Sequence, residues 1–106
     1  MLNIGDLQNL CGDKSIAITK HAKYRLTERD ITVENIKNAI HAGEIIEQYE
    51  NDKPFPSCLV LGSTEKNQYI HVVASVGGEF LYIITAYKPD KNGWEPDLKT
   101  RKGGLI

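Results

Sequence analysis

The stretch from Lys20 to Ile31 places an imidazole and two guanidinium groups where they could hold a phosphate. On a helix of 3.6 residues per turn, His21, Arg25 and Arg29 recur at every fourth position and share one face. Guanidinium suits phosphate because its fork of donors matches two oxygens, and imidazole exchanges a proton near neutral pH. The alternative is a solvated helix face whose arginines pair with Glu28 or other acids, at about 0–1 kcal/mol per surface pair.

A second group of reactive side chains is expected on two strands later in the chain. The run from Tyr69 to Val76 alternates between two sets of side chains, which predicts a strand with His71 on one face. The run from Glu79 to Tyr87 is the most strand-like of the sequence. His71 either faces a ligand or is hydrogen-bonded within the sheet, to Thr85 or to a neighbouring backbone group.

The register of the hairpin between these strands decides which side chains share a face, because a slip of one residue exchanges the faces. A two-residue Gly77-Gly78 loop puts His71 opposite Ile84, and it is the favoured short hairpin. A three-residue loop with a bulge puts His71 opposite Thr85. We favour the second register because it groups the polar side chains. It gives a polar face of Tyr69, His71, Thr85 and Tyr87, and a core that gains Phe80, Tyr82 and Ile84.

Beyond the last strand, prolines at positions 89 and 96 and a glycine at 93 argue against regular structure. Trp94 is the only tryptophan of the chain. It is either an anchor that fixes this segment to the sheet or a stacking platform for a base, with Arg101 beside it to contact a phosphate.

The rest of the sequence predicts short helices followed by strands. Ile4, Leu7 and Leu10 have helical spacing, and residues 16–18 are expected to be extended. Thr19 is an expected N-cap of a helix ending near residue 30. Thr32 is the expected cap of a second helix, which has His41 in its last turn and Gly43 just past its end. Strands are expected over 45–49, 57–61, 69–76 and 79–87. The predicted fold is α+β, with two or three N-terminal helices packed on a four-stranded antiparallel sheet, in one domain spanning residues 1–106.

Composition and charge exclude several classes of function. The 106 residues are 41% hydrophobic and 25% charged, with a net charge of −1, and residues 28–52 carry seven acidic and two basic groups. Extended duplex binding is therefore not expected, because it needs a strong basic excess. No apolar run could span a bilayer and no secretion signal is present, so we expect a cytoplasmic protein. Cys11 and Cys58 are expected to be reduced and buried, and no metal or other cofactor is predicted.

Several of these residues occur in the order typical of one family. They are His21-Ala22, Arg25, Glu28-Arg29, Asp30-Ile31-Thr32, His71-Val72-Val73, Thr85 to Asp90, and Trp94. Over about residues 20–102 the chain resembles an uncharacterised bacterial family, domain of unknown function 4258. Its predicted layout of helices and sheet is similar to that of the RelE- and BrnT-like toxins and of barnase-like folds. Those toxins are metal-independent ribonucleases of toxin–antitoxin pairs.

The resemblance implies cleavage of RNA through attack of a ribose 2′-hydroxyl. Such an enzyme needs a base, a proton donor for the leaving oxygen, and cations around the phosphate. His71 and His21 are assigned as the acid–base pair, with Tyr87 as a further proton donor. The substrate-binding assignments are Arg25, Arg29, Thr85, Trp94 and Arg101. The central expectation is that the two imidazoles converge with the two helical arginines on one pocket.

A non-catalytic module that binds a protein or a nucleic acid with the same fold is the second hypothesis. The acidic stretch 28–52, between two mildly basic ends, suits a protein interface as well as an enzyme. The partners that the sequence leaves open are RNA, an antitoxin or other protein, and a second copy of the chain. Growth arrest on induction, or its absence, separates the toxin hypothesis from the binding module.

Overall fold

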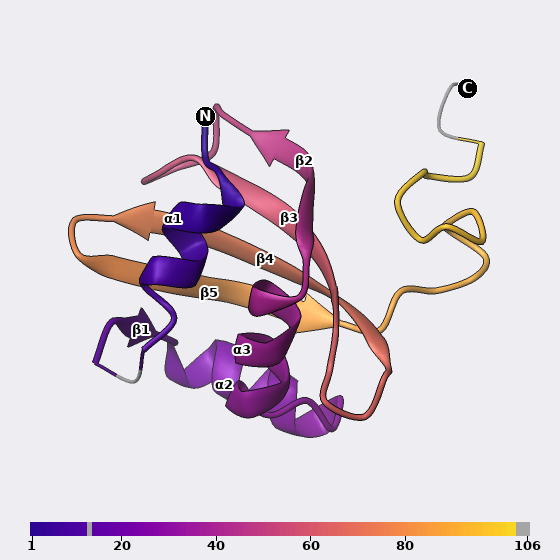
Figure 1. The fold of residues 1–106 in the computed structure, drawn as a ribbon, viewed down its shortest axis with the longest axis horizontal. Helices are drawn as coiled ribbons and strands as arrows, with labels where there is room; N and C mark the ends of the chain where they lie inside the picture. Colours follow the sequence, from indigo (N-terminus) through magenta and orange to yellow (C-terminus); the bar gives the residue numbers. More distant parts are fainter. Residues whose placement is uncertain (13, 104–106) are drawn as a thin grey trace.

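A computed structural model describes residues 1–12 and 14–103 of the chain. Three helices lie on one face of a twisted sheet, and a C-terminal segment loops beyond the end of β5 (Figure 1). The helices are α1 (Ile4–Asn9), α2 (Lys20–Glu28) and α3 (Val33–His41). The strands are β1 (Ile16–Ala17), β2 (Glu44–Tyr49), β3 (Ser57–Ser63), β4 (Tyr69–Gly77) and β5 (Phe80–Tyr87).

The two longer helices begin at the expected threonines. The Thr19 hydroxyl accepts the backbone N–H of Ala22 at 3.1 Å, and Thr32 forms a capping box with Asn35. Helix α2 stops because Asp30 adopts a left-handed conformation (φ 57°), a geometry often found just past helix ends. These local signals confirm the predicted N-caps of the second and third helices.

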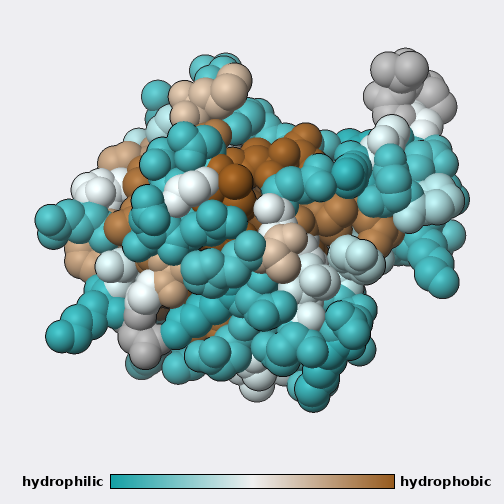
Figure 2. Space-filling view, viewed as in Figure 1, coloured by the Kyte–Doolittle hydropathy of each residue, from teal (hydrophilic) through white to brown (hydrophobic). Residues whose placement is uncertain are grey.

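The core lies between the helices and the near face of the sheet. It joins one stripe from each helix to alternate residues of β3, β4 and β5, and includes Leu7, Leu26, Ile36, Ile40, Val60, Val72 and Leu81, each at most 2% exposed. Helix α3 packs directly on β3 at Gly62, where a Cβ atom would lie 1.9 Å from the Ala39 carbonyl oxygen. Figure 2 shows the helix-covered side, where apolar surface gathers in the middle, over the strands, and hydrophilic residues surround it.

The predicted four-stranded antiparallel sheet is wrong. The described residues form a five-stranded mixed sheet in the order β1-β5-β4-β3-β2, in which β1 runs parallel to β5 and the other neighbours are antiparallel. Strand β1 is held by ladder contacts that include Leu81 N–H to the Ser15 carbonyl at 2.8 Å. Two residues are too few to give an alternating pattern, so this strand has no signal of its own in the sequence.

Neither predicted hairpin register is found. The turn lies at Gly78 and Glu79, and a bulge near Val73 shifts the pairing so that His71 faces Tyr87. His71, Thr85 and Tyr87 do share one face, as predicted. The expected burial of Phe80, Tyr82 and Ile84 in the helix-covered core is wrong: Tyr82 pairs with Ser75 on the other face, while Phe80 and Ile84 are each 44% exposed. The bulge changes the alternation midway along β5, which local sequence rules do not reveal.

Candidate functional site

The sheet face that points away from the helices carries three rows of cross-strand neighbours. From β2 to β5 these rows are Glu44–Leu61–His71–Tyr87, Glu47–Leu59–Val73–Thr85 and Tyr49–Ser57–Ser75–Tyr82. We call this surface the helix-free face. Polar, aromatic and titratable side chains therefore gather here from residues up to 43 positions apart, and the face is the natural place to look for chemistry.

His71 occupies the first row and is completely buried. Its Nε2 lies 2.8 Å from the Leu98 carbonyl oxygen and its Nδ1 lies 3.2 Å from the Tyr87 hydroxyl. Since a carbonyl only accepts, Nε2 carries the hydrogen, and Nδ1 accepts from Tyr87. Burial lowers the pKa of the imidazole, an effect opposed by the Leu98 carbonyl, so the ring is neutral at pH 7 with both nitrogens engaged.

The segment over residues 88–103 covers this histidine. Trp94, 6% exposed, packs edge-on against the imidazole with ring centroids 4.5 Å apart. The segment closes on itself through an antiparallel bridge between Trp94 and Arg101, and Leu98 lies in a left-handed conformation (φ 60°). Such a backbone is uncommon for a leucine, and it persists where the surroundings hold it in place. Trp94 is thus an anchor on the sheet, as one of its two interpretations proposed.

A carboxylate, a guanidinium and a phenol meet in the part of the face nearest to solvent. Arg101 donates from Nε to Glu47 Oε2 at 2.9 Å and from Nη2 to Oε1 at 3.0 Å, while the Tyr49 hydroxyl donates to Oε1. The guanidinium also lies over the Trp94 ring, 4.7 Å from its centroid. The Arg101 and Glu47 side chains are 55% and 23% exposed, so a ligand can reach them. We call these three residues the Glu47 cluster.

The pKa shifts in this cluster keep each group in a defined protonation state. The Arg101 hydrogen bonds hold the pKa of Glu47 below its ordinary value, and the Tyr49 hydroxyl adds to this. Burial and the bond to Glu47 raise the pKa of Tyr49 to about 12. At neutral pH the site therefore presents a charged carboxylate beside a protonated phenol and a permanent cation.

Glu47 and Tyr49 were not selected from the sequence. Both lie on β2, where a bulge between Ile45 and Glu47 interrupts the alternation that would have shown them on one face. Arg101 was selected, but its partner lies 54 positions away. A period-two reading that started at Glu47 would have placed Glu47 and Tyr49 together, without indicating what they contact.

Arg29 reaches the open edge of β5. Its Nη1 donates to Thr85 Oγ1 at 2.9 Å and to the Ala86 carbonyl at 3.0 Å. This contact joins two predicted substrate-binding residues and satisfies a backbone carbonyl on an unpaired stretch of strand edge. The arginine is thus bound to the sheet, in place of the ion pair with Glu28 that was its alternative.

The structure does not bring His21 and Arg25 into the cluster. Both are exposed on α2, and among the described residues no hydrogen bond, ion pair or ring contact joins either to His71 or Glu47. The two imidazoles therefore differ in environment, one in solvent and the other sealed beneath Trp94. A shared acid–base pair would need a rearrangement of one of these elements.

Other features of the site can be stated briefly. Within residues 1–12 and 14–103, no group of three or more histidine, cysteine, aspartate or glutamate side chains is arranged to hold a metal ion. Cys11 and Cys58 are free and buried, as predicted. In the same residues, every helix is too short or too polar to cross a bilayer.

Comparison with known proteins gives one match. A family model described as a domain of unknown function, DUF4258, matches residues 18–88. We find no match among curated proteins or among solved structures. The matched region contains α2, α3, β2 to β5 and therefore Glu47, Tyr49 and His71, whereas Trp94 and Arg101 lie beyond it.

Proposed function

This chain belongs to the DUF4258 family, and from that premise we propose that its helix-free face cleaves single-stranded RNA without a metal ion. The observation that carries the proposal is the Glu47 cluster: a charged, solvent-accessible carboxylate held against a guanidinium and a phenol. The proposal includes the likeness to RelE- and BrnT-like toxins, which rests on the sequence alone.

Each group of the cluster has a role in transesterification. The Glu47 carboxylate takes the proton of the ribose 2′-hydroxyl as this oxygen forms its bond to phosphorus. The Arg101 guanidinium moves onto the non-bridging oxygens and offsets the charge that develops there. Tyr49, with a pKa of about 12, stays protonated and gives its proton to the 5′-oxygen as the phosphorus–oxygen bond breaks. The products are a 2′,3′-cyclic phosphate and a free 5′-hydroxyl.

His71 acts in this scheme as a positioning residue. Its ring supports Trp94 and binds the Leu98 carbonyl, and this fixes the segment that carries Arg101. Tyr87 holds the imidazole from the other side. A direct proton transfer by His71 is not part of the proposal, because neither ring nitrogen is available to a substrate in this arrangement.

The test is incubation of the purified chain with a single-stranded RNA oligonucleotide in excess chelator. We expect fragments that end in a cyclic phosphate, identified by mass, because the 2′-hydroxyl is the nucleophile and no metal takes part. A substrate of the same sequence with 2′-O-methyl groups should remain intact. RNA that is uncut at high protein concentration would reject the proposal.

A non-catalytic binding module is the second candidate, and one observation favours it. Both oxygens of Glu47 are already bonded within the cluster, to Arg101 and Tyr49, so the cluster also serves as a clasp for residues 88–103. Lys99 adds to the clasp through an ion pair with Glu44 at 3.1 Å. If RNA stays intact in the cleavage assay, the result supports the binding module.

A further inference from the structure

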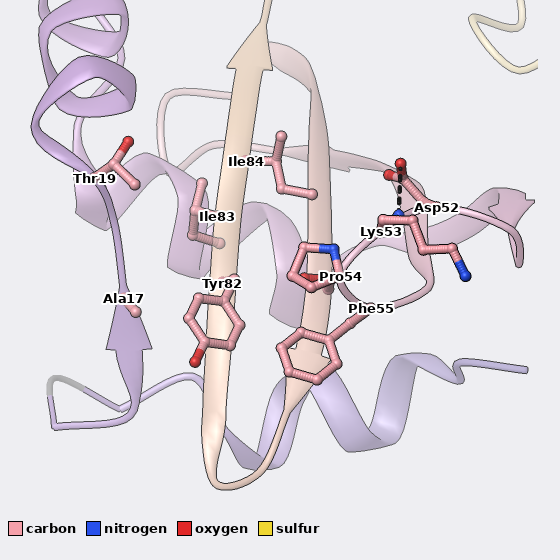
Figure 3. Close-up of a pocket in the computed structure, with 10 residues that line it drawn as sticks. Ala17, Thr19, Asp52, Lys53, Pro54, Phe55, Tyr82, Ile83 and Ile84 are labelled. Carbon is pink, nitrogen blue, oxygen red and sulfur yellow. Dashed lines mark hydrogen bonds between the residues drawn. The ribbon is translucent and has the colours of Figure 1, made fainter.

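A groove opens on the helix-free face beside the third row, which contains Ser75 and Tyr82, whereas His71 lies in the first row. The groove lies between β5, the junction of β1 with α2, and the loop that precedes β3 (Figure 3). Its volume is about 450 Å³. The groove walls include Thr19, Pro54, Phe55, Tyr82 and Ile84. This volume is within the range of pockets that bind small molecules, about 300–1,000 Å³.

The aromatic wall of this groove is built into the fold. The Phe55 and Tyr82 rings are stacked, with centroids 5.9 Å apart and an interplanar angle of 19°. Phe55 lies flat on β4 at Gly77, where a Cβ atom would come within 2.4 Å of the phenylalanine ring. The residue is nevertheless 38% exposed. Figure 3 shows its ring at one end of the groove, beside Tyr82. A flat apolar surface is therefore held open to a ligand.

Ser75 adds one polar group to the lining of the groove. The residue is 5% exposed, and among the described residues no hydrogen bond joins its hydroxyl to another group. Because no buried side-chain polar atom in that part of the chain lacks a partner, this hydroxyl is open to the groove. The neighbouring Ser57 differs, since its hydroxyl donates to Asp52 at 2.6 Å. A hydroxyl that has no partner within the chain and lines an apolar groove is free to bond to the polar edge of a ligand.

We propose that this groove binds an unpaired nucleobase of the RNA strand that the Glu47 cluster cleaves. A base has two flat faces for the Phe55–Tyr82 wall and a hydrogen-bonding edge for Ser75. Lys53 stands at the rim with its ammonium directed to solvent, where the strand's phosphates would pass (Figure 3). The neighbouring Asp52 carboxylate accepts hydrogen bonds from the Ser57 hydroxyl and from the Lys53 backbone N–H, so its oxygens are directed to groups of the chain itself.

The placement of the groove sets which nucleotide it takes. Ser75 lies two strands away from Glu47, in the next row. From the usual spacing of strands and of residues along a strand, the two residues are roughly 12 Å apart. The base bound here therefore belongs to a nucleotide that flanks the scissile phosphate. This inference rests on the proposed function for the identity of its ligand, and the groove itself is tested without cleavage.

The experiment measures binding of a 2′-O-methyl RNA hexamer, which cannot be cleaved by 2′-hydroxyl attack. Phe55→Ala should raise the dissociation constant roughly 5- to 150-fold, the range for loss of one base–aromatic stack. Ser75→Ala should raise the dissociation constant roughly 2- to 12-fold through loss of one hydrogen bond. Tyr24→Ala, which removes an exposed aromatic ring on α2 outside the groove, is the matched control and should bind as the wild type does.

The outcomes separate the two proposals. Weaker binding by Phe55→Ala and Ser75→Ala but not by Tyr24→Ala supports the groove, whether or not the chain cuts unmodified RNA. Cleavage of RNA by a wild type whose hexamer affinity matches that of both groove variants overturns the groove and leaves the proposed function standing. A wild type that does not bind the hexamer also overturns the groove.

Discussion

Glu47→Gln should lower kcat/KM for RNA cleavage by about 10²–10⁴, the usual contribution of a positioned acid or base. Glutamine keeps the size of the side chain and an oxygen that can accept from Arg101, so the segment that carries Arg101 stays in place. It cannot take up the 2′-hydroxyl proton. The measurement is initial cleavage rates of a fluorescent single-stranded oligonucleotide in chelator, with folding of the variant checked by circular dichroism.

Glu44→Gln is the matched control for this experiment. Glu44 lies on the same strand and is also paired with the C-terminal segment, through Lys99, but it is not part of the Glu47 cluster. Its exposed ion pair is worth little, so cleavage should stay within about threefold of the wild type. Equal activity of wild type and Glu47→Gln would contradict the assignment of the base.

His71→Ala should lower the free energy of unfolding by about 3–5 kcal/mol. The change leaves a cavity under Trp94 and removes the hydrogen bonds to the Leu98 carbonyl and the Tyr87 hydroxyl. Urea unfolding followed by tryptophan fluorescence measures the loss, because Trp94 is the only tryptophan and lies on the imidazole. His41→Ala, at an exposed position outside the cluster, should change stability by less than about 0.5 kcal/mol.

The same site allows positioning to be distinguished from proton transfer. Glutamine at position 71 can donate to the Leu98 carbonyl but cannot act as an acid or base at neutral pH. His71→Gln should therefore keep cleavage within about tenfold of the wild type, with the same pH dependence. A loss of cleavage activity beyond about 100-fold in a folded His71→Gln protein would show that the histidine takes part in proton transfer.

The parts of the fold that local chemistry determines could be predicted from the sequence. Thr19 and Thr32 cap their helices through side chains three residues from the groups they bind, and the alternation of β4 indicates its two faces. Strand β1 could not be predicted, because two residues carry no periodicity and their pairing depends on β5, some 65 positions away. The bulge near Val73 depends likewise on how two whole strands fit together.

The sequence predicted several residues of the candidate site, but not how they are arranged. His71, Thr85 and Tyr87 share a face because strand pairing is regular, and this follows from period-two alternation. The burial of His71 depends on a segment that folds back through Trp94 and Leu98, and its prolines and glycine indicate only an irregular path. The pairing of Glu47 with Arg101 is likewise a long-range contact, which neither residue's neighbours in the sequence reveal.

The most direct test of the claim that a carboxylate and not an imidazole supports cleavage is the pH dependence of kcat/KM between pH 4 and pH 8. The pKa of Glu47 is held below its ordinary value of 4.5, and that of Tyr49 is raised to about 12. The base is thus ionised and the acid protonated throughout pH 5–8, so the account predicts a plateau there, with activity lost only as pH falls below about 4.5. Activity that falls as pH rises from 6 to 8 would show that a protonated imidazole is required, and would contradict the account.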